Sequence, residues 1–402
     1  MTTATPSRGM LVVALLVIAS VMGLAATDLV LPAIPDLPAA LGGTPTEAQY
    51  VLASFSIGGV FGLLGFGALA SRYPPRWLLL SSLLVFAVLS IAAAQVDGIW
   101  ALIALRFFQG IASSAAQVIA PGVIRALFSE QGALRAIGVL GSFESLAPAL
   151  APIAGVWLLK AFGWNASFYT LCLTAAVLLG CTLLLFRHFP TTVVASTEAS
   201  DRFSYLRLLR SPVYWRYAAS QALTLGGLLV FVFGAPVVIT RSLGGAIEDF
   251  IIMQVSGIST FILAANAAPR LAERFGAERI ILFGTTLSAA GALGILVFAL
   301  LGAGDPVWLI PLFIPMNFGL GLRGPPGFYH AVLAADGDDA RGAALLILLV
   351  LLFTFGGTVA VAEVIEQGLV PLAGAALLLS MSSVVVLLTL PKLNTTTTAD
   401  LD

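Results

Sequence analysis

Four ionisable side chains stand within long apolar stretches of this 402-residue sequence, two acids and two bases. The acids are Asp28 and Glu144, and the bases are Arg106 and Arg323. A charged side chain at the centre of a membrane helix costs about 2.5–3.5 kcal/mol even on a lenient insertion scale, so each of these residues is a candidate for function. Carboxyl groups in such surroundings can exchange protons near neutral pH, and the arginines can pair with them or with a substrate.

Asp28 and Arg106 are both predicted near the outer side of the membrane. Asp28 is either a proton site or a residue that reaches the outer headgroups and caps a helix broken by Pro32. Arg106 starts a polar stripe whose members fall within about 80° of one another on a helical wheel. The stripe consists of Arg106, Gln109, Ser113 and Gln117. We expect it to face a wet cavity; the alternative is an arginine that extends outward to the membrane surface.

Glu144 precedes two prolines in the inner half of another apolar stretch. Pro148, Pro152 and Gly155 follow it at helical spacing, so all four residues share one face of a helix. A purely structural kink would explain the prolines and the glycine. It would not explain Glu144, which we therefore interpret as a second candidate proton site.

Arg323 allows two interpretations of equal weight. If its apolar stretch continues from about 307 to 333, Arg323 lies near the middle of a helix, with Asn317 and His330 on either side; otherwise it is an inner-loop charge. In the first case Arg106 and Arg323 occupy equivalent helices, and two cavity arginines would favour an anionic substrate. Further polar residues could line the cavity or pack between helices: Gln221, Thr224, Gln254, Ser256 and Asn266.

The composition predicts the elements that position these residues. Apolar types make up 59% of the chain, and its 19 basic and 20 acidic residues compare with about 100 charges in a soluble chain of this length. This excludes a soluble, disordered or collagen-like chain, and a net charge of −1 without a basic domain excludes a nucleic-acid binder. Runs of about 20 apolar residues predict membrane helices. Twelve occur, at 10–33, 48–71, 76–96, 99–124, 135–160, 164–186, 213–239, 249–270, 278–301, 307–333, 341–364 and 368–390.

Loop charges predict how these helices are oriented. With a cytoplasmic amino terminus, 15 of the 19 basic residues lie on the inner side, and the outer loops hold only Lys160 and Arg241. This excess predicts that both termini lie in the cytoplasm and that the number of spans is even. We expect a multi-pass protein of the cell (inner) membrane. We expect two six-helix bundles at 1–187 and 213–392, a cytoplasmic linker at 188–212 and a tail at 393–402.

No residue pattern indicates an enzyme, a metal site or a cofactor. The sequence lacks HExxH, GxSxG and GxxxxGK[ST] patterns, and His188 and His330 are far apart. Cys172 and Cys181 lie on opposite faces of one predicted helix, where they cannot bridge each other. We therefore expect no catalytic residue, no metal and no cofactor.

A short motif recurs at half the length of the chain. Residues 69–73, Leu-Ala-Ser-Arg-Tyr, match residues 271–275, Leu-Ala-Glu-Arg-Phe, at an offset of 202. Each copy follows the second apolar run of its half. The repeat indicates duplicated halves related by an axis along the membrane normal, with a substrate site between them.

Four motifs make the chain resemble the major facilitator superfamily, and within it the drug/proton antiporters with twelve spans. They are Thr27–Pro35 (TDLVLPAIP), Gly67–Arg76 (GALASRYPPR), Leu105–Gly110 (LRFFQG) and Ala147–Gly155 (APALAPIAG). The last is similar to the two-proline form of the Bcr/CflA branch. The resemblance implies an all-α integral membrane protein with twelve transmembrane helices in two pseudo-symmetric six-helix bundles, commonly a monomer.

The resemblance also implies roles for particular residues. Asp28 would be the proton or cationic-substrate site, and Arg106 would sense protonation of Asp28 or Glu144 and change partners. From the polar stripe and from the place of Arg323 in its span, rather than from the resemblance, we expect Gln109, Gln117 and Arg323 to act as charge partners or substrate contacts. The loop motif would form a gate with its second copy, made of Gly67, Arg72, Arg76, Glu273 and Arg274. Ser71 and Pro74 stand where this motif usually has an acid and a glycine.

Together, these observations predict a proton-coupled exporter of small organic compounds such as drugs. Its partners would be protons, the substrate and the lipid bilayer, and it would work by alternating access of the two bundles. One rival hypothesis is an organic-anion or metabolite transporter on the same fold. A more remote one is a membrane receptor or enzyme that transports nothing.

Overall fold

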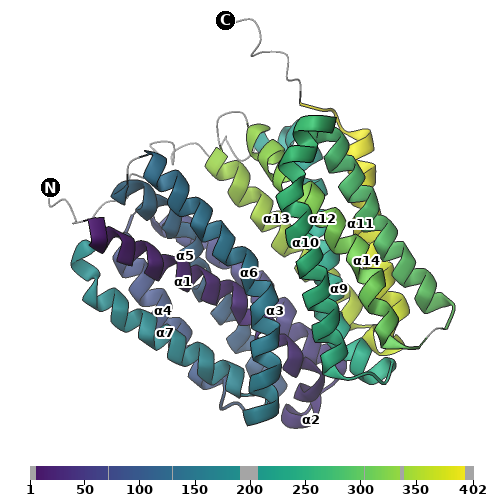
Figure 1. The fold of residues 1–402 in the computed structure, drawn as a ribbon. Coiled ribbons are helices and arrows are strands. Elements are labelled where there is room, and N and C mark those ends of the chain that lie inside the picture. Colours follow the sequence, from purple (N-terminus) through teal and green to yellow (C-terminus); the bar gives the residue numbers. More distant parts are fainter. Residues whose placement is uncertain are drawn as a thin grey trace, which may run out of the picture. The chain divides into compact units, whose positions relative to one another are not determined.

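The computed structural model describes residues 6–70, 72–128, 130–190, 207–302, 304–335 and 339–393. Every regular element among these residues is a helix (Figure 1). Helices suit a bilayer because they satisfy their backbone hydrogen bonds within one segment. The chain divides into two compact units, Met1–Ser200 and Asp201–Asp402, here called the first and the second unit.

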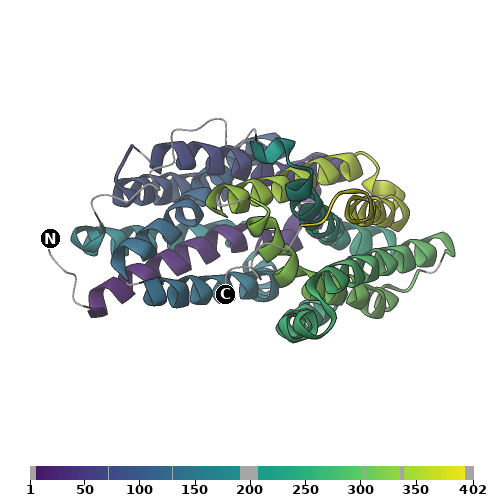
Figure 2. The same ribbon diagram turned by 90° about the horizontal axis from the view of Figure 1, so that it is seen from above.

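Six long helices run alongside one another in the described part of the first unit (Figure 1 and Figure 2). They are α1 (Pro6–Asp28), α3 (Pro45–Ala70), α4 (Pro75–Ala93), α5 (Ile99–Leu127), α6 (Glu130–Phe162) and α7 (Ala166–Leu184). Two short helices, η1 (Leu31–Asp36) and α2 (Leu37–Leu41), connect α1 to α3, and η2 (Phe186–His188) follows α7.

The second unit likewise contains six long helices among its described residues. They are α9 (Pro212–Val237), α10 (Ile247–Phe275), α11 (Ala277–Leu300), α12 (Leu309–Leu333), α13 (Asp339–Ala362) and α14 (Leu369–Thr389). The short helices are η3 (Val238–Ser242), which continues α9 as a π-helix, η4 (Pro306–Trp308) and η5 (Ile365–Gln367).

The twelve predicted spans are confirmed as helices, and no bound differs from its prediction by more than five residues. Eleven helices in the described part of the chain are long and apolar enough to cross a membrane. The twelfth, α6, has 33 residues, more than the about 20 that a span requires. Most of the predicted linker (191–206) and of the predicted tail (394–402) lies outside the described residues, as does Ser71.

The tenth span is one continuous helix despite its prolines. Pro315, Pro325 and Pro326 all lie inside α12. Arg323 is therefore a residue of a membrane helix, and the interpretation of it as an inner-loop charge was wrong. Neighbouring helices can satisfy carbonyls that prolines leave free, which is why such helices persist in membranes.

Both units pack their helices in the same way. In the first unit α5 packs against α1, α3 and α4, while α1 also packs against α6, and α4 against α7. In the second unit α12 packs against α9, α10 and α11, while α9 also packs against α13, and α11 against α14. These matching sets of neighbours confirm two pseudo-symmetric six-helix bundles.

The first helix ends five residues earlier than predicted, at Asp28. Pro32 has no N–H with which to continue the helical bonding toward the carbonyl of Asp28. The backbone tightens instead: Val30 donates to the carbonyl of Thr27 at 3.1 Å, and Ala33 donates to that of Val30 at 2.9 Å. These two bonds begin the 3₁₀ helix η1 and place Asp28 at a helix end.

Glycines bring the backbones of α3 and α5 into direct contact. A Cβ atom on Gly58 would lie 2.0 Å from the carbonyl oxygen of Phe107, and one on Gly110 would lie 2.1 Å from that of Phe55. Gly65 and Gly67, on the same helix as Gly58, have no such neighbour within 4 Å. The surface of α3 that packs closely against α5 therefore includes Gly58 but neither Gly65 nor Gly67.

We predict that Gly58→Ala destabilises the first unit, whereas Gly65→Ala on the same helix does not. The added methyl group at 58 would collide with backbone, and overpacking typically costs about 1–3 kcal/mol. At 65 it meets open space, where alanine gains up to about 1 kcal/mol of helix propensity over glycine. Thermal unfolding of the two purified variants in detergent tests this. Equal unfolding midpoints for the two variants would contradict the close contact between Gly58 and the backbone of Phe107.

Candidate functional site

The strongest candidate site surrounds the end of α1 and the residue that follows it, Ala26–Leu29, here called the α1 end. The final carbonyl groups of a helix lack partners within the helix. At the α1 end, side chains from other helices supply two: Nη1 of Arg106 on α5 donates to the carbonyl of Ala26 at 3.3 Å, and Oγ of Ser167 on α7 donates to that of Leu29 at 2.9 Å. A cation is also favourable at a helix C-terminus, where the helix dipole is negative.

A glycine of α6 closes a further side of the α1 end. A Cβ atom on Gly155 would lie 2.4 Å from the carbonyl oxygen of Leu29 and 3.2 Å from Cδ of Pro32. No larger residue fits there without movement of the backbone. Three of the sequence motifs, those at 27–35, 105–110 and 147–155, therefore meet at this one place.

Asp28 is the ionisable residue of the α1 end. Its side chain is buried, with 8% of the residue exposed, and among the described residues its carboxyl group has no hydrogen bond and no ion pair. Burial argues against the interpretation that Asp28 extends to the outer headgroups. An acid at the negative end of a helix dipole, without a donor, is poorly stabilised in its charged form.

Arg106 is completely buried, and its guanidinium group lies over the ring of Phe55, 4.1 Å from the ring centroid. Gln109 accepts from Nη1 of Arg106 at 3.3 Å and donates to Oγ of Ser90 on α4 at 2.9 Å. The prediction that this stripe faces a wet cavity was wrong for Arg106 and Gln109, because α1, α3 and α4 pack over them. Gln117, at the far end of the stripe, is half-buried.

The expected direct pairing of Arg106 with an acid is absent from the described residues. Neither Asp28 nor Glu144 forms an ion pair with it, and its Nε and Nη2 atoms have no hydrogen-bond partner there. Arg106 instead contacts the backbone two residues before Asp28. The structure thus connects the two residues through the α1 end rather than through a salt bridge.

Glu144 contacts the same helix at another depth. It is half-buried on α6 near Ser20 of α1, whose Oγ forms no hydrogen bond among the described residues. Ser20 precedes Asp28 by eight residues, which corresponds to about 12 Å along a helix. The two candidate acids are therefore not neighbours. Pro148 and Pro152 lie inside α6, as the sequence predicted.

The predicted gate residues lie at helix ends and are mostly exposed. Gly67, Arg72, Glu273 and Arg274 are exposed, and Arg76 is half-buried with its guanidinium group 4.5 Å from the ring centroid of Phe186. Their role as a gate stays a prediction.

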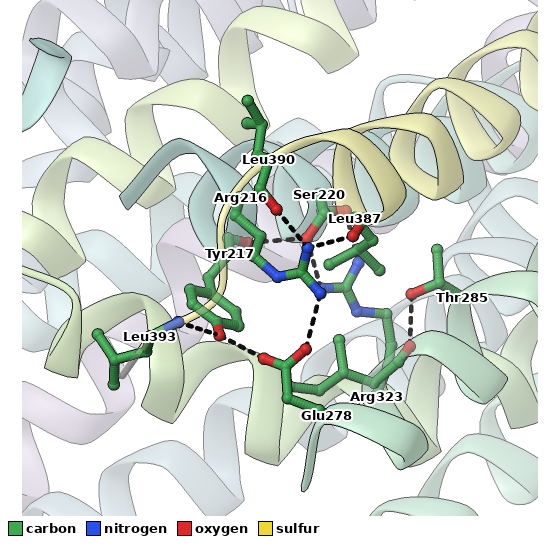
Figure 3. A network of polar contacts seen from close by, with 10 residues as sticks. Arg216, Tyr217, Ser220, Glu278, Thr285, Arg323, Leu387, Leu390 and Leu393 are labelled. Atoms are coloured by element: carbon green, nitrogen blue, oxygen red, sulfur yellow. Dashed lines mark hydrogen bonds and ion pairs between the residues drawn. The ribbon is translucent and has the colours of Figure 1, made fainter. Parts of the chain in front are cut away.

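Arg323 is completely buried in the second unit without an acidic partner among the described residues. Its Nη1 donates to the carbonyl of Ser220 at 2.5 Å (Figure 3). The same atom donates to Thr224 Oγ1 at 2.8 Å and to Ser383 Oγ at 3.4 Å. Its Nη2 donates to Ser220 Oγ at 3.1 Å. These oxygens come from α9 and α14, so the guanidinium group is held between helices of its own unit.

Arg106 and Arg323 lie on equivalent helices but not at equivalent positions. A Cβ atom on Gly110 would approach the carbonyl of Phe55 on α3, and one on Gly321 would lie 2.4 Å from that of Phe261 on α10. If these glycines are aligned, the residue four positions earlier is Arg106 in one unit and Asn317 in the other. The second unit thus has an amide where the first has its buried cation.

Sequence reasoning missed one polar cluster. Arg216 was counted among the inner-loop charges, yet it is buried in α9 and forms an ion pair of 2.7 Å with Glu278 of α11. Tyr217 also donates a hydrogen bond to Glu278. A signal was available, because Arg216 lies three residues inside a predicted span.

Comparison with known proteins bears on the whole chain. Residues 16–361 match the Major Facilitator Superfamily. The chain is 26% identical over 298 residues to the bicyclomycin resistance protein homolog of Haemophilus influenzae (73% of this chain, 72% of that protein). It is 25% identical over 311 residues to a chloramphenicol resistance protein of Pseudomonas aeruginosa (75% and 74%). A solved bacterial homolog of the human lysosomal transporter Spinster, inward-facing and unoccupied, has a TM-score of 0.73 at 11% identity (96% and 95%).

We predict opposite effects of removing the two buried arginines of the second unit. In Arg323→Met, Ser383 still bonds to the carbonyl of Ser220 and to Thr224, so no hydroxyl loses its partner. An apolar replacement of similar volume is then neutral or stabilising. Arg216→Met leaves the Glu278 carboxylate, which is 28% exposed, without its cation. We expect this to lower the free energy of unfolding by about 1–3 kcal/mol. Thermal unfolding in detergent gives the midpoint of each variant. A midpoint for Arg323→Met below that of the unsubstituted protein would contradict the prediction.

Proposed function

Because the chain belongs to the Major Facilitator Superfamily, and is therefore a secondary transporter of small molecules and not an enzyme, we propose that it exports small organic compounds in exchange for protons. The observation that carries this proposal is Asp28, a buried acid without a partner among the described residues. It lies at a helix end where two antiporter-like motifs contact α1. The export itself would proceed by alternating access of the two bundles.

Coupling would operate through the α1 end. While Asp28 is protonated, its neutral carboxyl group does not attract the Arg106 cation, and Arg106 donates to the carbonyl of Ala26. Loss of the proton would place a negative charge beside the helix end. Arg106 has Nε and Nη2 without partners, so it has donors available to respond to that charge. Any such movement of Arg106 would change the cap of α1 and hence the conformation around the site.

Glu144 would act as a second proton site. Ser20, the residue of α1 near Glu144, precedes Asp28 by eight residues, so protonation of each acid would act on a different turn of the same helix. In this proposal the prolines of α6 give that helix the bend that lets it follow α1. The exposed residues Arg72 and Glu273 would belong to the gate at the inner side.

The substrate would be a small organic compound of the antibiotic type. Two relatives are named for resistance to bicyclomycin and to chloramphenicol, and these two compounds are the first to test. We further propose an inner-membrane location with both termini in the cytoplasm, and a monomer as the working form. The excess of basic residues in the predicted inner segments supports this orientation.

The organic-anion hypothesis receives no support from the surroundings of Arg323. It required a guanidinium group free to bind a substrate anion. The Nη1 and Nη2 donors of Arg323 are instead engaged by Ser220, Thr224 and Ser383 inside the second unit. We therefore do not advance it as a second function.

We predict that Asp28→Asn abolishes transport driven by a pH gradient, because the amide cannot exchange a proton. The protein should still fold, since an amide is neutral like the protonated acid and the carboxyl of Asp28 has no bond to lose among the described residues. An efflux-deficient bacterial host expressing the variant would be grown on chloramphenicol, bicyclomycin and a wider panel of toxic compounds, and uptake into inverted vesicles measured at several pH values. The matched control is Asp36→Asn, an exposed acid of the adjoining η1. Unchanged export by Asp28→Asn at every pH would remove Asp28 from the mechanism.

Arg106→Lys tests the second half of the mechanism. Lysine keeps the charge but has no planar guanidinium group to lie over Phe55 while donating to both Ala26 and Gln109. We expect export driven by the pH gradient to fall by about tenfold or more, equivalent to losing about 1.4 kcal/mol of coupling between the sites. Arg270→Lys, at an exposed position of α10, serves as the control. Full activity in Arg106→Lys would show that only the charge matters.

A further inference from the structure

A second polar cluster, absent from the proposed transport mechanism, lies in the second unit beside the chain that leaves α14. It consists of Arg216, Tyr217 and Glu278, here called the inner clasp (Figure 3). Nη2 of Arg216 donates to Oε2 of Glu278 at 2.7 Å, and the hydroxyl of Tyr217 donates to Oε1 of the same carboxylate. Two residues of α9 thus hold one acid of α11.

The inner clasp also binds the chain beyond α14. Nη1 of Arg216 donates to the carbonyl of Leu387 and, at 2.7 Å, to that of Leu390. The backbone N–H of Leu393 donates to the hydroxyl of Tyr217 at 3.1 Å, and the Leu393 side chain packs against the buried cluster that includes Tyr217. Residues 391–393 are therefore fixed at both ends of the segment.

Both charges of the inner clasp lie at helix ends whose dipole has the opposite sign. Leu387 and Leu390 contribute carbonyls at the C-terminus of α14, which is the negative end of that helix and accepts from the Arg216 cation. Glu278 is the second residue of α11, where the positive end of the helix favours an anion. Arg216 therefore has the carboxylate of Glu278 on one side and the negative end of α14 on the other, and Glu278 has the Arg216 cation and the positive end of α11.

The inner clasp is linked by hydrogen bonds to the buried Arg323. Oγ of Ser220 donates to the carbonyl of Tyr217 at 3.1 Å and accepts from Nη2 of Arg323 at 3.1 Å. Oγ of Ser383, one turn before Leu387 on α14, donates to the carbonyl of Ser220 at 2.7 Å. A continuous set of polar contacts thus joins α9, α11, α12 and α14.

We propose that the inner clasp is a docking site for the chain's own segment Pro391–Leu393, and that this docking holds one end of α14 to α9 and α11 so that the three helix ends move as one body during transport. The occupant is chosen by the observed bonds to Leu390 and Leu393. The proposal goes beyond the proposed exchange of protons and does not depend on which compound is exported.

Amide hydrogen exchange of the full-length protein in detergent, read by mass spectrometry on peptides from 386 to 402, tests the docking. Tyr217→Phe removes the acceptor of the Leu393 N–H and keeps the ring, so exchange in the peptide that contains Leu393 should become about tenfold faster, as expected for one lost hydrogen bond. Tyr329→Phe, an exposed tyrosine of α12, is the matched control and should leave it unchanged. Equal protection in Tyr217→Phe and wild type would overturn the docking.

A second set of variants tests whether the three helix ends behave as one body. In Glu278→Gln, faster exchange should appear together at the start of α11, at the end of α14 and in Pro391–Leu393, while Arg279→Gln, the exposed neighbour, changes none of them. The double variant Arg216→Gln with Glu278→Gln should exchange no faster than the more affected single variant, because both act through one pair. Faster exchange confined to α11, or additive effects, would overturn the proposal. These measurements need no substrate, so they decide on the inner clasp even if Asp28→Asn were to disprove proton coupling.

Discussion

Among the described residues, three arginines are buried inside their units, Arg106, Arg216 and Arg323, and burial of a guanidinium group is costly unless oxygen acceptors bind its N–H groups. The solutions differ. Arg106 uses a free carbonyl at the end of α1 and the face of Phe55. Arg216 uses the carboxylate of Glu278 and carbonyls at the end of α14, and Arg323 uses a backbone carbonyl and hydroxyl groups of α9 and α14. Each of the three arginines donates to at least one acceptor on another helix and so connects helices of its own unit.

Two of these arginines act on the same kind of feature, the C-terminus of a membrane helix. A helix that ends within the membrane or at its surface leaves carbonyls without donors, and a guanidinium group supplies several donors and a compensating charge at once. α1 ends this way because Pro32 interrupts it, and the interruption is what places Asp28 at a helix end beside Arg106's acceptor. The same geometry that stabilises the break thus brings an acid and a cation close without pairing them.

The two units have kept one packing scheme while their polar interiors have diverged. Equivalent helices have equivalent neighbours, and the glycine contacts of α5 with α3 and of α12 with α10 correspond. Yet Arg106 aligns with Asn317, and Arg323 has no charged counterpart in the first unit. Packing depends on small residues at a few contact points, which tolerate change elsewhere on the same helix. The first unit holds the acid of the proposed proton exchange, whereas the buried arginines of the second unit bind acceptors within that unit.

The sequence by itself determined the membrane location, the twelve helices within five residues, the duplication and the family, because hydropathy, helix length and short motifs are local properties of the chain. It also singled out Asp28 and Arg106 as charges within spans, whereas it left Arg323 open between a span and an inner loop. Only the tertiary structure decided what these charges contact. The wheel that placed Arg106 and Gln109 on one face was correct, but which helices cover that face is a long-range matter, and so was the pairing of Arg216 with a residue 62 positions away. Contacts between distant segments depend on how helices pack, and a single sequence carries no direct record of that.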